Sequence, residues 1–140
     1  GEAPDFFRAL EGSLRSCVLE RPAHKVALFI EMAAEAHRNP DVARSIGGCE
    51  SVLRAILVGL VERARAAGQV SARVDPDKLV TVMLLIGDAL FMRRAMNPGF
   101  DCEAVVPELM RMIRSLMIDE TPLAVADAHL LHTLSLGAAQ

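Results

Sequence analysis

The feature that most constrains the fold is a nearly uninterrupted apolar run from Leu79 to Met92. Asp75-Pro76 before it is a typical N-cap and first helical residue, and Asn97-Pro98-Gly99 after it ends a helix. The expected helix, 76–96, is therefore apolar around nearly its whole circumference. Such a helix must be covered on more than one side, because a one-sided core would leave leucines and methionines in water. The run is shorter than the roughly 18 residues that a membrane span needs, so we expect no membrane segment.

The rest of the chain also repeats apolar residues at helical spacing between Pro, Gly and Asp signals. Tyr and Trp are absent, and no sustained period-two alternation indicates a strand. We therefore expect an all-α fold, a helical bundle of five to seven helices with a break at Gly47-Gly48. The expected helices span about 5–17, 22–38, 41–46, 49–67, 76–96, 103–118 and 122–136.

The expected helix 103–118 carries two apolar seams at heptad-like spacing, which implies two neighbours. One seam contains Val105, Leu109, Met112 and Leu116, and the other contains Val106, Met110, Ile113 and Met117. Pro107 leaves open whether regular helix begins at 103 or only at the proline, because a proline inside a helix loses a hydrogen bond.

Length and charge narrow the class of protein. The 140 residues fit one domain, 1–140. Fifteen Lys and Arg against eighteen Asp and Glu give a net charge of −3, so this chain has no basic excess with which to bind nucleic acid. Cys17, Cys49 and Cys102 are scattered and odd in number, which predicts reduced, buried thiols in a cytoplasmic protein.

No constellation of side chains predicts catalysis, so we expect no enzyme, no cofactor and no metal site. His129 and His132 share a helix face near Asp127 but lack a fourth ligand, and solvated histidines are the simpler interpretation. Asp88 is the most informative polar residue, because a buried carboxylate needs a partner. That partner is either a helix–helix hydrogen bond or arginine, or a bound molecule that Asp88 anchors.

Several short motifs occur in an order that resembles the regulatory domains of tetracycline-repressor-type (TetR family) transcriptional regulators. The motifs are Phe29-Ile30-Glu31-Met32-Ala33-Ala34-Glu35-Ala36-His37-Arg38-Asn39-Pro40-Asp41-Val42-Ala43, then Arg54 with Leu57, Leu60 and Val61, then Ala67-Gly68-Gln69-Val70 and Asp75-Pro76. Ile86-Gly87-Asp88-Ala89-Leu90 is similar to the family's Asp-Gly-Leu element, with Gly and Asp in swapped order. The resemblance covers residues 5 to 118.

This resemblance implies the regulatory domain of a bacterial, cytoplasmic repressor that binds a small, largely apolar effector. Helices 76–96 and 103–118 would form a four-helix interface in a homodimer. The family's N-terminal helix-turn-helix has no counterpart here, so we expect the chain to be part of a longer protein that contacts operator DNA through that domain. Residues 119–140 lie beyond the family's last helix and are expected to add one extra helix.

The resemblance and the spacing together give two sets of candidate residues. The ligand-binding candidates are Phe6, Leu10, Phe29, Met32, Ala33, Leu53, Leu57, Met83, Asp88 and Leu90. The dimer-interface candidates are Leu85, Ala89, Met92, Met96, Leu109, Met110, Ile113 and Met117.

Two other functions stay open. One is a helical homodimeric interaction module whose interior is solid and holds no ligand. The other is a small helical enzyme that uses histidine or cysteine chemistry at His24 or His37, although no base, nucleophile and orienting group can be assembled from the spacing.

Overall fold

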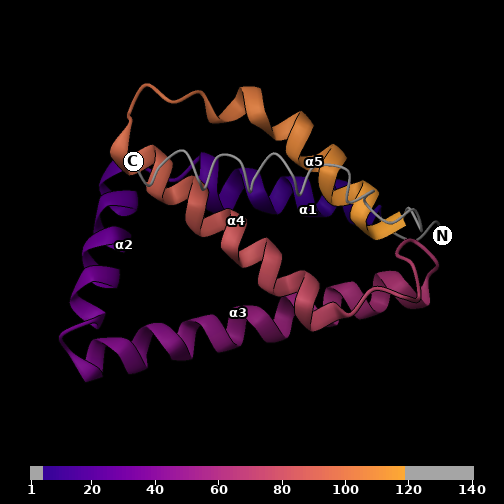
Figure 1. Cartoon of the computed structure of the whole chain (residues 1–140), viewed down its shortest axis with the longest axis horizontal. Coiled ribbons are helices and arrows are strands. Elements are labelled where there is room, and N and C mark those ends of the chain that lie inside the picture. Colours follow the sequence, from indigo (N-terminus) through magenta and orange to yellow (C-terminus); the bar gives the residue numbers. More distant parts are fainter. Residues whose placement is uncertain (1–4, 119–140) are drawn as a thin grey trace, which may run out of the picture.

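The computed structural model describes residues 5–118, which form α-helices and one short π-helix, with no strand in this range (Figure 1). The elements are α1 (Phe6–Leu14), η1 (Arg15–Leu19), α2 (Ala23–Ala36), α3 (Pro40–Ala66), α4 (Pro76–Met96) and α5 (Cys102–Ile118). The all-α prediction is confirmed. The helix expected over 122–136 lies outside the described residues. Among the described helices, none is both long and apolar enough to cross a membrane.

Three helices begin where capping chemistry predicts. The side chains of Asp5, Asn39 and Asp75 each accept a hydrogen bond at 3.0 Å from the backbone N–H two residues later. Pro40 and Pro76 occupy the first helical position, where a missing N–H costs nothing. These local signals fix the start of α1, α3 and α4.

The expected break at Gly47-Gly48 is wrong, because α3 runs as one helix from Pro40 to Ala66. Glycine adopts helical backbone angles without a clash, and its cost of about 1 kcal/mol relative to Ala is small beside the cooperativity of a long helix. The Ser51 hydroxyl also donates a hydrogen bond to the Gly47 carbonyl at 2.8 Å. The short helix 41–46 and the helix 49–67 are therefore one element.

The start of α5 precedes Pro107, which answers the question left open by the sequence. The helix begins at Cys102, and the Asp101 side chain accepts a hydrogen bond from the Ala104 N–H at 3.2 Å. The proline lies just beyond the first turn, so the helix loses only the hydrogen bond that this residue would donate.

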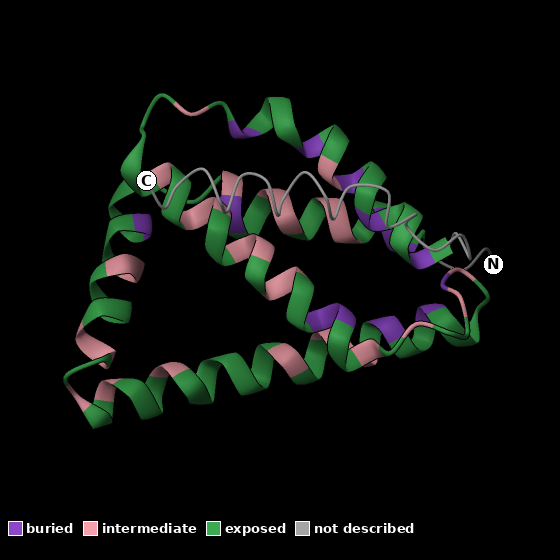
Figure 2. Ribbon diagram, viewed as in Figure 1, coloured by how far each residue is buried: buried purple, intermediate pink, exposed green. Residues whose placement is uncertain are grey.

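Helices α2, α3 and α4 contact one another pairwise and appear as the sides of a triangle in Figure 1. We call them the three-helix frame. Helix α1 contacts α5. Buried residues gather on α5, on the start of α4 and on the end of α3, whereas α2 and the first half of α3 are mostly exposed (Figure 2). The core therefore lies at one end of the molecule and the frame extends from it.

The two seams of α5 have different surroundings. The inner seam, Val106, Met110, Ile113 and Met117, is buried in the core of the same chain with Phe6 and Phe7 of α1. The Arg114 guanidinium also lies 4.4 Å from the centre of the Phe7 ring. The outer seam, Val105, Leu109, Met112 and Leu116, includes three exposed apolar side chains and the half-buried Leu109. One of the two neighbours implied by the sequence is thus α1.

The prediction of three buried thiols holds only for Cys102. Cys17 lies on η1 and Cys49 in the middle of α3, and both are exposed because the core covers neither position. All three are free thiols. Burial raises the pKa of the Cys102 thiol, and the nearby positive charge of Arg94 partly opposes that rise.

Candidate functional site

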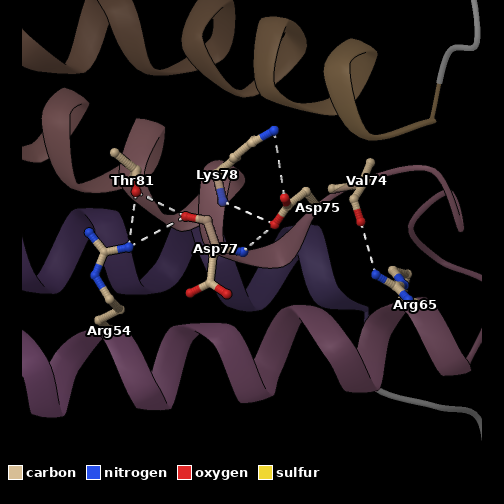
Figure 3. Close-up of polar contacts among 7 residues, drawn as sticks. All are labelled: Arg54, Arg65, Val74, Asp75, Asp77, Lys78 and Thr81. Atoms are coloured by element: carbon tan, nitrogen blue, oxygen red, sulfur yellow. Dashed lines mark hydrogen bonds and ion pairs between the residues drawn. The ribbon is translucent and has the colours of Figure 1, made fainter.

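The three-helix frame is closed at the corner between α3 and α4 by polar contacts (Figure 3). Arg54 on α3 donates to the Thr81 hydroxyl on α4 at 2.9 Å, and Thr81 in turn donates to the Asp77 carbonyl at 2.9 Å. Arg65, near the end of α3, donates to the Val74 carbonyl at 3.0 Å. These contacts join α3 to the start of α4, so the two helices diverge from a fixed corner.

An aromatic pair joins α2 to α4. The rings of Phe29 and Phe91 are stacked with their centres 4.9 Å apart and their planes at 26°. Both side chains are half-buried. Such a pair stabilises its contact by about 0.5–1.5 kcal/mol beyond the area that it buries. The sequence predicted Phe29 as a site residue but missed Phe91, because a helix that is apolar all round does not reveal which face meets α2.

The predicted ligand-binding residues fall into two groups. Phe6 is buried in the core, and three more pack against the core: Leu10, Leu57 and Met83. The others lie on the frame outside this core cluster and are half-buried or exposed: Phe29, Met32, Ala33, Leu53, Asp88 and Leu90. The structure therefore does not bring the ten residues together at one place, and the α1 members belong to the packing of α1 against α5.

An open groove of about 460 Å³ lies between the second half of α2 and the first turns of α3. Its lining is Glu31, Met32, Glu35, Asp41, Val42 and Ser45. Two of its carboxylates are paired, Glu35 with Arg38 at 2.8 Å and Asp41 with Arg44. Met32 is the one predicted ligand-binding residue in this lining.

Within residues 5–118, Asp88 has none of the protein partners that a buried carboxylate would need. Its side chain is exposed, and no hydrogen bond or ion pair joins it to another residue in the range 5–118. Partial removal from water still raises the pKa of this carboxyl above its ordinary value, and the negative charge of Glu50 raises it further. The expected arginine or hydrogen-bond partner is therefore not found in this part of the chain.

The predicted dimer residues also divide. On α4 the residues Leu85, Ala89, Met92 and Met96 are all exposed and repeat at alternating steps of four and three; we call them the α4 seam. On α5, Leu109 is half-buried, whereas Met110, Ile113 and Met117 belong to the inner seam. Three exposed apolar residues of α5, Val105, Met112 and Leu116, belong to the outer seam, of which the dimer set contained only Leu109. Periodicity cannot separate two seams that are equally apolar.

Residues 5–118 hold no group of three or more His, Cys, Asp or Glu side chains placed to bind a metal ion. His129, His132 and Asp127 lie outside the described residues. His24 and His37 are both exposed on or beside α2. Comparisons with protein-family models, with curated proteins and with solved structures find no match to this chain.

Proposed function

We propose that this chain is the effector-binding and dimerisation domain of a TetR-type transcriptional regulator. The exposed apolar α4 seam and outer seam of α5 are the observation that carries this proposal. The ordered motifs that resemble the family provide independent support. In this proposal DNA is bound by a helix-turn-helix domain outside residues 1–140, which agrees with the net charge of −3 in this chain.

The dimer uses the last two described helices. Leu85 and Met96 on α4 and Met112 on α5 each keep more than half of their surface exposed, at 61%, 64% and 57%. Apolar residues repeated at heptad spacing on two helices favour packing against a second copy, in which four helices bury the seams. This arrangement is consistent with a helix 76–96 that needs cover on more than one side.

The effector occupies the frame, beside the Phe29–Phe91 pair. Ala33, Leu53 and Leu90 provide apolar surface on α2, α3 and α4, and Asp88 is the polar anchor. A small, largely apolar molecule suits this lining, since such sites combine apolar walls with few polar groups. Binding would favour one arrangement of the dimer over another, and a coupling of about 1–3 kcal/mol would change operator affinity roughly 5 to 150-fold.

Native mass spectrometry of the purified chain tests both parts of the proposal. We expect a species at twice the chain mass of 15.1 kDa, carrying the added mass of a small organic molecule. Ala33→Trp should remove the added mass and keep the dimer, because the large indole would compete with the effector for the surface proposed to bind it. Ala27→Trp is the matched control on another face of α2, and it should change neither.

Other outcomes separate the rival functions. A monomer at micromolar concentration contradicts the dimer. A dimer that carries no added mass, even after incubation with a set of apolar aromatic compounds, favours a homodimeric interaction module without a ligand site. Turnover lost on replacing His24 or His37 with the fold intact would favour an enzyme.

A further inference from the structure

The end of η1 is held by a side chain from a helix that is far away in the sequence. Arg94, in the last turn of α4, donates one guanidinium N–H to the Val18 carbonyl and another, at 2.8 Å, to the Arg21 carbonyl. These carbonyls lie more than 70 positions away in the sequence. Two charge-assisted hydrogen bonds from one planar group fix both distance and orientation.

The held segment is an irregular one. Residues Arg15–Leu19 form a π-helical turn, closed by a hydrogen bond from the Glu20 N–H to the Arg15 carbonyl at 2.8 Å. The Arg21 side chain donates to the Cys17 carbonyl at 3.0 Å, so arginines satisfy the carbonyls at this helix end. Single π-turns inside or beside α-helices are rare and occur frequently at functional sites.

The same side of α4 also holds α2. Phe91 lies three positions before Arg94, and residues at this spacing are neighbours on a helix surface. Phe91 stacks on Phe29, whereas Arg94 holds Arg21, the residue immediately before Pro22, the N-cap of α2. A movement that separates α2 from α4 at the aromatic pair therefore also pulls the segment that Arg94 holds.

We propose that Arg94 is a positioning residue that couples the Phe29–Phe91 contact to η1, so that separating the two rings loosens the π-helical turn and the end of α1. As a route by which an effector acts on α1, this inference rests on the proposed function. The coupling itself is tested without an effector, so its failure is distinguishable from failure of the proposed effector site.

The test is hydrogen–deuterium exchange of the whole chain, read at the amides of residues 15–21. We expect Arg94→Gln to accelerate exchange there about tenfold or more, the size expected for loss of charge-assisted hydrogen bonds. Arg93→Gln is the matched control and should leave exchange unchanged, because Arg93 is an exposed arginine in the same turn of α4 whose side chain makes no hydrogen bond or ion pair within residues 5–118. Equal exchange in Arg94→Gln and wild type would overturn the proposal.

A double-mutant cycle separates coupling from simple support. Phe91→Leu removes the ring stack and should accelerate exchange at residues 15–21 about threefold in wild type, but not further in the Arg94→Gln background. Additive acceleration would overturn the proposal, since it means that Phe91 reaches η1 without Arg94. Exchange in α5 reports global unfolding. If Arg94→Gln also accelerates exchange in α5, the test uses Arg94→Lys instead, because lysine keeps the positive charge but lacks the planar guanidinium. The same two outcomes then support or overturn the proposal.

Discussion

The position of Asp88 on the apolar helix α4 links the stability of the chain to pH. The carboxyl keeps solvent contact, yet partial burial and then the negative charge of Glu50 raise its pKa. The folded chain therefore holds this proton more tightly than the unfolded chain does. Protonated Asp88 favours folding fully below the ordinary carboxyl pKa of about 3.9, and that contribution is lost as pH rises through the raised folded pKa.

Replacing Asp88 with Asn should therefore stabilise the chain at pH 7, because the amide has no charge to desolvate. The expected gain is small, up to about 0.5 kcal/mol, since solvent screens a side chain this exposed. It should shrink as pH falls and vanish below about pH 3.9, where wild-type Asp88 is neutral. Urea unfolding at several pH values measures it. A gain that does not change with pH would assign the effect to packing of the amide instead of charge.

At the scale of elements, α3 provides the clearest prediction. Gly47 and Gly48 have negative φ angles, and an added Cβ at either position would have no atom within 4 Å. Gly47→Ala and Gly48→Ala should therefore each stabilise the chain by about 0.5–1 kcal/mol in urea unfolding, by lowering the entropy of the unfolded chain. Gly68→Ala should destabilise it, because Gly68 has a φ of 74°. A destabilising Gly47→Ala would indicate that the helix breaks there.

The elements also show which parts of the fold the sequence could predict. Asn39-Pro40 and Asp75-Pro76 identify helix starts because capping uses atoms within three residues of the cap. The continuity of α3 could not be predicted in this way, since two glycines change the balance by only about 2 kcal/mol in total. The π-turn at η1 could not be predicted locally either, because the carbonyls at its end accept hydrogen bonds from Arg94 on another helix.

The candidate site was harder to predict from the sequence than the helix starts, because it depends on contacts between residues far apart in the chain. The family resemblance predicts Phe6 in the ligand site, but Phe6 packs into the core with the inner seam of α5. That packing decides which seam of α5 faces outward, and nothing local distinguishes Ile113 from Met112. On α4, Leu85, Ala89, Met92 and Met96 form one exposed line as a heptad pattern predicts, whereas the contact between Phe91 and Phe29 depends on where α2 lies.

For the whole molecule, the proposed dimer makes different predictions for outward and inward apolar residues. Leu85→Glu and Met112→Glu should each lower the mass measured by light scattering at micromolar concentration from twice the 15.1 kDa of one chain to that of one chain. A glutamate in either seam would be buried without a partner in the dimer but solvated in the monomer. Far-UV circular dichroism should show unchanged helix content, because both positions are exposed in the single chain.

Two further variants assign the interface. Val52 is 63% exposed on α3, outside both seams, so Val52→Glu should leave the dimer intact. A monomer with Val52→Glu, together with dimers for Leu85→Glu and Met112→Glu, would place the contact on α3 instead of α4 and α5. Ile113→Glu should reduce helix content as well as mass, because Ile113 is buried in the core of its own chain. A folded Ile113→Glu monomer would instead mean that the inner seam faces the partner in solution.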